Sequence, residues 1–162
     1  MIPYKVGLGY DIHRLEEERL LIIGGVEIPY EKGLYGHSDA DVLIHAIIDA
    51  LLGGASLPDI GTIFPDTDMQ YKGADSTVLL KKVCEMVSEK GFLIGNIDSN
   101  IIAQAPKMMP YIPKMKEVLS SVMGINIENI SIKAKTNEKM DAVGEKRAIE
   151  ANAVVLLLRK EV

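Results

Sequence analysis

The stretch SDADVLIHAIIDALLGG (residues 38–54) carries the strongest secondary-structure signal in this chain of 162 residues. Its apolar residues recur at the three- and four-residue spacing that lines one face of a helix: Leu43, Ile47, Ala50 and Leu51. Ser38, with Asp41 three residues later, follows the pattern of a capping box in which the acid replaces the usual Glu. Because Gly53 and Gly54 end the pattern, the sequence predicts a helix from about residue 39 to residue 52, with Ser38 as its N-cap.

Strands and further helices are predicted on both sides of this helix. Strand-like runs precede it at 4–13, 19–25 and 26–30, and the paired glycines between the last two predict a hairpin turn. After it we expect helices at 76–91 and 110–124, and strands at 95–104, 129–136 and 148–160. This order predicts one α+β domain over residues 1–162, a mostly four-stranded sheet with helices packed on one face.

Composition and charge exclude several classes of protein. A net charge of -5, with two Phe and no Trp, argues against binding to nucleic acid. The longest apolar run, AVVLLL (153–158), is too short to span a membrane. The strand pattern begins at once, so no targeting peptide is expected; we predict a cytoplasmic protein, or one of the plastid stroma if a transit peptide has been removed. The single cysteine, Cys84, forbids an internal disulfide and is predicted to be a small buried hydrophobe.

All three histidines lie in the first third of the chain, each near an aspartate. On a strand, Asp11 and His13 point to the same face, and His45 lies on the polar face of the predicted helix, four residues after Asp41. Asp11, His13 and His45 could hold one metal ion and leave a fourth position open, as in catalytic zinc sites, with Asp41 orienting a ring. Two alternatives stay open: a surface Asp–His pair, and a non-haem iron site.

Three further segments are candidates for binding anions. His37 and Ser38 precede the predicted helix, whose N-terminus favours phosphate; alternatively, Ser38 only caps the helix and His37 is a solvated loop residue. Lys107, in AQAPKMMP (103–110), suits a phosphate beside a flat ring, and Glu138, in KAKTNEK (133–139), suits a hard cation. Spacing alone favours the alternatives, an ordinary strand-to-helix connection for 103–110 and a solvated charged turn for 133–139. The twenty-residue stretch 57–76 is predicted to be a functional or mobile loop.

Taken together and in order, these segments resemble the 2-C-methyl-D-erythritol 2,4-cyclodiphosphate synthase family of the non-mevalonate isoprenoid pathway. The matching stretches cover most of the chain: GYDIHR, IIGGVEIPYEKGLYGHSDADVLIHAIIDALLG, DIGTIFPDTD, YKGADS, GNIDSNIIAQAPKMMPYIPKM and IKAKTNEKM. The resemblance implies a homotrimer with active sites at the subunit interfaces and zinc in each site. It also implies a magnesium or manganese ion that bridges the substrate diphosphate.

The resemblance also implies individual roles. Zinc would be bound by Asp11, His13 and His45, the transition state stabilised by His37 and Thr136, and the second cation bound by Glu138. Contacts to the erythritol-phosphate end would come from Asp11, Ile12, His13, His37 and Ser38. The ribose contacts and the mobile loop would fall on Asp59, Ile60, Gly61, Phe64, Pro65, Asp66, Thr67 and Asp68. The cytidine pocket would be formed by Ala103, Gln104, Ala105, Pro106, Lys107, Met108 and Met109, completed by Lys135, Thr136, Asn137 and Glu138.

The implied reaction is intramolecular. The 2-phosphate of 4-diphosphocytidyl-2-C-methyl-D-erythritol 2-phosphate attacks the β-phosphorus and expels CMP, forming 2-C-methyl-D-erythritol 2,4-cyclodiphosphate. The cations, Lys107 and the helix N-terminus would offset the charge repulsion, and no protein nucleophile is needed. Alternative functions are a metal-dependent hydrolase or oxygenase that uses the same three ligands, and a nucleotide-binding module whose metal is structural.

One segment departs from the family pattern. The family usually has glycine, basic, glycine, acidic where this chain has GEKRAIE (144–150), so Glu145 and Arg147 occupy the basic and acidic positions in exchanged order. Ala142 also replaces a common aromatic residue. In the family these positions line a cavity on the trimer axis that can hold an isoprenoid diphosphate. We therefore predict weak binding of such a ligand here, and an ion pair between Arg147 and Glu145 of neighbouring subunits.

Overall fold

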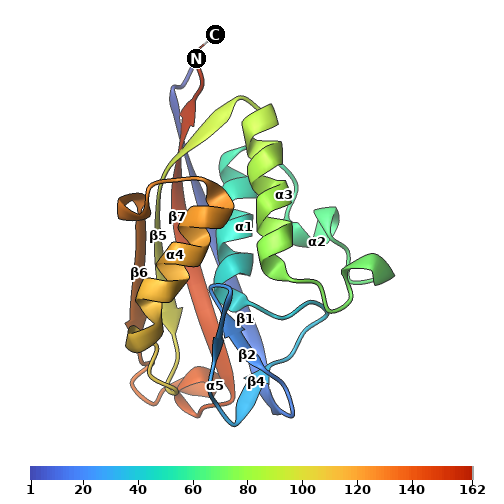
Figure 1. The fold of residues 1–162 in the computed structure, drawn as a ribbon, viewed down its shortest axis with the longest axis vertical. Coiled ribbons are helices and arrows are strands. Elements are labelled where there is room, and N and C mark those ends of the chain that lie inside the picture. Colours follow the sequence, from blue (N-terminus) through green and yellow to red (C-terminus); the bar gives the residue numbers. More distant parts are fainter. Residues whose placement is uncertain (162) are drawn as a thin grey trace.

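The structure, a computed structural model, describes residues 1–161 and contains a mixed five-stranded sheet (Figure 1). The strand order is β4-β1-β7-β5-β6, in which β5 and β6 are parallel and the other neighbours are antiparallel. The strands are β1 (Tyr4–Glu17), β4 (Lys32–Leu34), β5 (Phe92–Ile102), β6 (Ile130–Lys135) and β7 (Ala148–Arg159). A separate hairpin joins β2 (Leu21–Ile23) to β3 (Val26–Ile28) through Gly24 and Gly25, which confirms the predicted turn.

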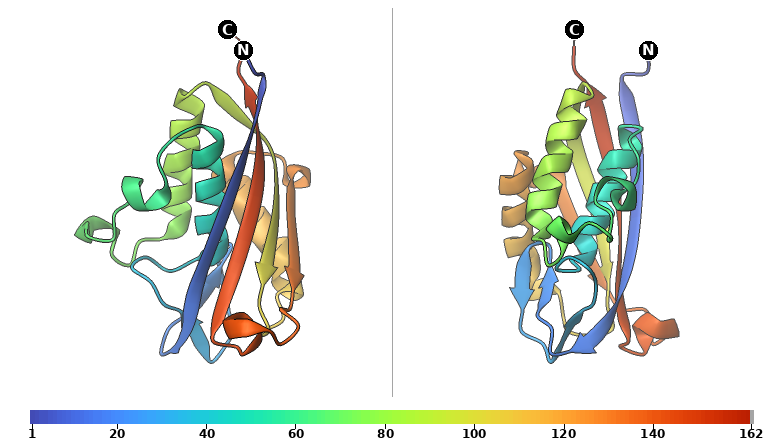
Figure 2. Two further views of the ribbon diagram at one scale, coloured as in Figure 1. Left: turned by 180° about the vertical axis from the view of Figure 1, so that it is seen from behind. Right: turned by 90° about the vertical axis from the view of Figure 1, so that its right-hand side faces the viewer.

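Three long helices cover one face of the sheet, as Figure 2 shows from behind and edge-on. They are α1 (Val42–Gly54), α3 (Ser76–Glu89) and α4 (Ile112–Met123). Short helical segments occupy the connections: α2 (Ile60–Ile63), η1 (Met69–Tyr71), η2 (Met109–Tyr111), η3 (Ile127–Asn129) and α5 (Asp141–Gly144). Gly91 and Gly124 follow α3 and α4 with φ angles of 89° and 65°, which glycine adopts without a steric penalty.

The α+β class and the covered face are confirmed, but the predicted count of four strands is wrong. The extra strand, β4, pairs with residues 15–17 of β1 at the edge of the sheet. It has only three residues, Lys-Gly-Leu, and so short a segment cannot show the alternation by which strands are predicted.

The N-terminus of α1 also differs from the prediction. The helix begins at Val42, and its N-cap is Asp41, whose carboxylate accepts a hydrogen bond from the Ile44 amide at 3.0 Å. The same buried carboxylate accepts bonds from the Gly24 and Gly25 amides at 2.9 and 2.7 Å. Ser38 is therefore not the cap, and Asp41 ties the hairpin turn to the helix instead of orienting a histidine ring. The carboxylate caps this N-terminus through one amide, and the role of the helix end in binding phosphate stays a prediction.

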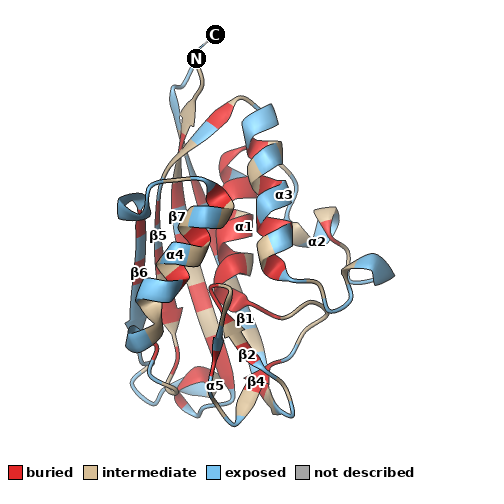
Figure 3. Cartoon of the chain, in the orientation of Figure 1, coloured by how far each residue is buried: buried red, intermediate tan, exposed pale blue. Residues whose placement is uncertain are grey.

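The backbone of α1 lies directly against β1. A Cβ atom added to Gly7 would lie 1.7 Å from the Ala50 carbonyl oxygen, and one added to Gly9 would lie 1.8 Å from the Ala46 carbonyl oxygen. Only glycine permits this approach, because any side chain would overlap the helix backbone. Figure 3 shows α1 as the most continuously buried helix, between the sheet and α3. The short separation brings the residues of α1 next to those of β1.

The opposite face of the sheet carries apolar side chains that are exposed in the single chain. The outward positions of β1 are Tyr4, Val6, Leu8, Tyr10 and Ile12, and Val6 and Leu8 are 67% and 72% exposed. Such a row is typical of a surface that contacts another protein. Within residues 1–161, no helix combines the length and the apolar character needed to cross a membrane.

Candidate functional site

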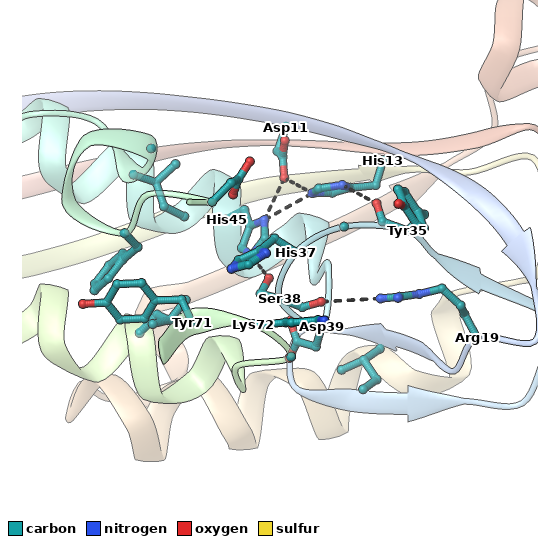
Figure 4. Close-up of a pocket in the computed structure, with 18 of the residues that line it drawn as sticks. Asp11, His13, Arg19, Tyr35, His37, Ser38, Asp39, His45, Tyr71 and Lys72 are labelled. Carbon is teal, nitrogen blue, oxygen red and sulfur yellow. Dashed lines mark hydrogen bonds and ion pairs between the residues drawn. The ribbon is translucent and has the colours of Figure 1, made fainter. Parts of the chain in front are cut away.

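Asp11, His13 and His45 converge at the contact between β1 and α1 (Figure 4). The Asp11 Oδ2 atom lies 2.7 Å from His13 Nε2 and 3.0 Å from His45 Nδ1. The two imidazole nitrogens are 3.2 Å apart. The strand alternation places Asp11 and His13 on one face of β1, and the glycine contact brings His45 to them from α1.

The Tyr35 backbone fixes the orientation of the His13 ring. His13 Nδ1 donates a hydrogen bond to the Tyr35 carbonyl oxygen at 2.9 Å. In the neutral ring, a proton on Nδ1 leaves a lone pair on Nε2, the atom that faces Asp11 and His45. The close contacts within the cluster are therefore attractive only when protons or a metal cation supply positive charge.

The charge of each group depends on its neighbours. Burial alone would raise the pKa of Asp11, but the contacts with His13 and His45 lower it by more, and the resulting pKa is about 2. Burial alone would lower the pKa of His45, whereas the hydrogen bond and the charge of Asp11 raise it above its usual value. Asp11 is thus an anion over the whole physiological range and favours a cation beside it.

These donor atoms fit a metal cation. Zinc bonds of about 2.0–2.2 Å in tetrahedral geometry place neighbouring ligand atoms about 3.3–3.6 Å apart. The separations of 3.0 and 3.2 Å are smaller by a few tenths of an ångström, and the separation of 2.7 Å is smaller by about 0.6–0.9 Å. One carboxylate and two imidazoles also suit non-haem iron, so the cluster is a candidate metal centre whose donor set does not identify the metal.

The cluster lies in a cleft of about 1070 Å³. Nine of the residues singled out from the sequence line it: Asp11, His13, His37, Ser38, His45, Ile60, Gly61, Phe64 and Asp66. A cleft of this size accommodates a phosphorylated small molecule. The structure thus brings together the metal candidates, the His37–Ser38 corner and part of the 57–76 segment.

The 57–76 segment has more local structure than a simple loop. Asp59 and Asp68 cap the short helices α2 and η1. The Phe64 and Tyr71 rings pack edge to face with centroids 5.2 Å apart. His37 contacts the segment twice, through Nε2 at 3.2 Å from the Asp68 carbonyl oxygen and through its own carbonyl, which accepts the Gly73 amide at 2.7 Å. These contacts attach the segment to the His37 corner.

The remaining predicted residues form a second group, away from the cleft. The ends of the parallel strands β5 and β6 bring 103–109 next to 135–138, where the Ala103 amide donates to the Lys135 carbonyl at 3.0 Å. Gln104 Oε1 accepts the Lys139 amide at 3.1 Å. Lys107, Thr136 and Glu138 are exposed, and none of this group lines the cleft. Within one chain the predicted site is therefore divided in two.

Sequence reasoning missed several residues of the cleft: Arg19, Tyr35, Asp39, Asp49, Tyr71 and Lys72. Asp49 accepts the Ile60 amide at 2.8 Å and so attaches the start of the 57–76 segment to α1, and burial raises its pKa. Its position four residues after His45 on the same helix face was a usable signal. Arg19 donates to the Leu34 carbonyl at 2.7 Å and lies near the Ser38 carbonyl at 3.4 Å, contacts that no local pattern indicates.

Two other predictions have definite outcomes. Arg147 and Glu145 form an ion pair at 2.8 Å within one chain, so this pair does not need a neighbouring subunit. Cys84 is half-buried, and burial raises its pKa to about 12. A thiol with so high a pKa is a poor nucleophile at neutral pH, in agreement with a packing role.

The fold and the cluster together define a class of α+β proteins that carry a candidate metal centre of one aspartate and two histidines in an open cleft. The YgbB family model matches residues 4–158 of this chain, and the chain belongs to the YgbB family.

Individual relatives match over nearly the whole length of this chain. The 2-C-methyl-D-erythritol 2,4-cyclodiphosphate synthase of Clostridioides difficile is 58% identical over 154 residues, 95% of this chain and 96% of the relative. The synthase of Burkholderia cenocepacia is 54% identical over 159 residues, which are 98% of this chain and 99% of the relative. Among solved structures, the IspF–CDP complex of Plasmodium falciparum aligns with a TM-score of 0.85 at 38% identity. The alignment covers 98% of this chain and 97% of the P. falciparum chain. The bifunctional IspDF of Campylobacter jejuni aligns with a TM-score of 0.94 at 39% identity; this chain spans 98% of its own length but only 43% of that protein.

Proposed function

We propose that this chain converts 4-diphosphocytidyl-2-C-methyl-D-erythritol 2-phosphate into 2-C-methyl-D-erythritol 2,4-cyclodiphosphate and CMP. The observation that carries the proposal is the convergence of Asp11, His13 and His45 in a cleft beside His37, in a chain 58% identical to a relative named for this synthase. The P. falciparum structure with CDP supports a cytidine nucleotide as part of the ligand.

In this proposal Asp11, His13 and His45 hold zinc, and Glu138 holds magnesium or manganese together with the substrate diphosphate. The bound cations supply positive charge that offsets the repulsion between two phosphate groups. Asp11 suits this role because its pKa of about 2 keeps it ionised, and His13 because the Tyr35 carbonyl fixes its ring.

The other residues bind and orient the reacting groups. An oxygen of the 2-phosphate attacks the β-phosphorus, the bond from that phosphorus to the bridging oxygen breaks, and CMP leaves with this oxygen. His37 and Thr136 stabilise the charge that develops at the β-phosphorus, while Ser38 binds the erythritol-phosphate end. Holding both ends of one molecule raises the effective concentration of the two phosphates. The reaction needs no protein nucleophile, which agrees with the high pKa of Cys84.

The active protein in this proposal is a homotrimer whose sites lie between subunits. Two observations support it: residues 103–109 and 135–138 lie away from the cleft of their own chain, and the outward row of β1 is apolar and exposed. Chains with His45→Ala and Lys107→Ala, each inactive alone, should regain part of the activity when refolded as a mixture. A mixture that stays inactive, or a monomer by native mass spectrometry, would refute the shared site.

Phosphorus NMR of the product tests the reaction directly. Incubation with the CDP-bearing substrate and zinc should yield CMP and a cyclic diphosphate, without uptake of oxygen or of labelled oxygen from water. Uptake of the label would instead support the metal-dependent hydrolase, and consumption of oxygen would support the oxygenase.

A further inference from the structure

Ser76 links a metal-ligand candidate to an aspartate that the proposed chemistry leaves unused. It is the first residue of α3 and is fully buried. The Asp39 carboxylate accepts both its backbone amide, at 3.0 Å, and its hydroxyl group. The Ser76 oxygen lies 3.1 Å from His45 Nε2, the ring nitrogen that faces away from Asp11.

The direction of each hydrogen bond follows from the number of hydrogens available. A carboxylate has no hydrogen to donate, so the Ser76 hydroxyl hydrogen must point to Asp39. The Ser76 oxygen can then only accept from His45, which requires a proton on Nε2. In the neutral ring the lone pair is then on Nδ1, which lies 3.0 Å from Asp11 and 3.2 Å from His13, and a cation between these atoms makes the contact with the Asp11 carboxylate favourable.

The Ser38 hydroxyl does not determine which nitrogen of the His45 ring carries the proton. Its oxygen also lies 3.1 Å from His45 Nε2 and accepts the Ala40 amide at 3.2 Å. Within residues 1–161, however, no carboxylate holds its hydroxyl hydrogen, so this hydroxyl can rotate to donate or to accept. The orientation of the His45 ring therefore depends on the Asp39–Ser76 pair.

We propose that Ser76, held by Asp39, is a positioning residue that fixes His45 with its proton on Nε2 and its Nδ1 lone pair toward the metal centre. The hydrogen bonds that run from the Asp39 carboxylate through the Ser76 hydroxyl to the His45 ring also increase the basicity of Nδ1. Hydrogen-bond partners of this kind typically contribute about 10–100-fold to metal affinity. Because Ser76 is the last residue of the 57–76 segment, the same bond connects the end of that segment to the candidate metal ligand. The inference rests on the proposed metal centre but not on the reaction.

Zinc affinity, measured by competition with a coloured chelator, tests this role without any turnover. Ser76→Ala should bind zinc about 10–100-fold more weakly than the unaltered protein. Ser76→Thr keeps the hydroxyl and should restore most of the affinity. Ser38→Ala is the matched control, because it removes the other hydroxyl at the same distance and should keep the affinity unchanged. Circular dichroism of each variant checks that the fold persists.

Nitrogen-15 NMR of the zinc-loaded protein gives a second measurement, which observes the His45 ring proton itself. With only three histidines in the chain, the ring signals are readily assigned. The Nε2 proton of His45 should be visible and exchange slowly with water, and in Ser76→Ala it should exchange faster. Equal zinc affinity of Ser76→Ala and the unaltered protein, or a rapidly exchanging Nε2 proton in the unaltered protein, would overturn the inference. If the unaltered protein binds no zinc, the metal centre fails as well; absence of the cyclic product with normal zinc binding would refute only the reaction.

Discussion

The contact between Gly9 and α1 allows a sharp test of how packing positions the metal centre. In Gly9→Ala the new Cβ atom would lie 1.8 Å from the Ala46 carbonyl oxygen and 2.7 Å from the Ala50 amide nitrogen. Ordinary contacts of this kind are 3.4–4 Å, so the strand and the helix must separate by about 1.5 Å. Both obstacles are backbone atoms and cannot rotate away as a side chain would.

This separation should affect stability and metal binding together. Overpacking of a core typically costs 1–3 kcal/mol, and with backbone on both sides we expect a loss of about 3 kcal/mol in the free energy of unfolding. His45 precedes Ala46, and metal–ligand distances tolerate only about 0.2 Å, so a displacement of about 1.5 Å removes Nδ1 from the centre. Loss of one ligand of three should weaken zinc binding by more than about 100-fold. This effect is larger than that of removing a hydrogen-bond partner of a ligand.

Gly53→Ala is the matched control in the same helix. A Cβ atom there would have the Leu8 carbonyl oxygen, at 4.0 Å, as its nearest neighbour. Alanine is about 0.8–1.0 kcal/mol more favourable than glycine inside a helix, so this variant should be slightly more stable and bind zinc normally. The assays are urea unfolding with a chelator present and zinc competition. If Gly9→Ala unfolds at the same urea concentration as the unaltered protein and binds zinc equally well, the close approach does not position His45.

Three further predictions concern charge, metal and ligand. Burial raises the pKa of Asp41 to about 6, from 3.8. The folded state therefore binds this proton more tightly, and the unfolding free energy should fall by about 3 kcal/mol as pH rises from about 4 to about 6. Asp41→Asn should remove that slope in urea titrations; an unchanged slope would exclude Asp41 as its source. His45→Ala or Asp11→Asn should abolish turnover while native mass spectrometry still detects the assembled protein, whereas near-full activity after chelation would contradict the metal assignment. Farnesyl diphosphate should bind weakly, because Glu145 replaces a basic residue and Arg147 is already paired; a tight, stoichiometric calorimetric titration would contradict this.

The metal cluster could be predicted from the sequence because it depends on two local periodicities. A strand places Asp11 and His13 on one face, and a helix places His45 on its polar side. Their meeting still requires the Gly9 contact, which is not visible in the periodicity of either segment. The spacing therefore groups the three side chains as possible ligands of one ion, and the resemblance to a known family identifies them as the zinc ligands.

The errors arise where contacts distant in sequence decide between local alternatives. The stretch SDAD offers several residues able to cap a helix, and Asp41 is selected by the Gly24 and Gly25 amides, which lie 17 and 16 residues earlier in the chain. Ser76 reaches His45 across 31 residues, with no pattern between them. Asp49 is different, because its position four residues after His45 places it on the same helix face and makes it predictable from the sequence.

The exposed apolar row of β1 has a consequence for how stability is measured. If Val6 and Leu8 are buried only on assembly, part of the free energy that opposes unfolding comes from association and not from the chain alone. The midpoint of thermal unfolding should then rise with protein concentration, and dilution alone should weaken the fold. Stabilities of variants are therefore comparable only at equal protein concentration. A chain that has dissociated on dilution would expose the outward face of β1, and an exposed apolar surface of this kind promotes aggregation.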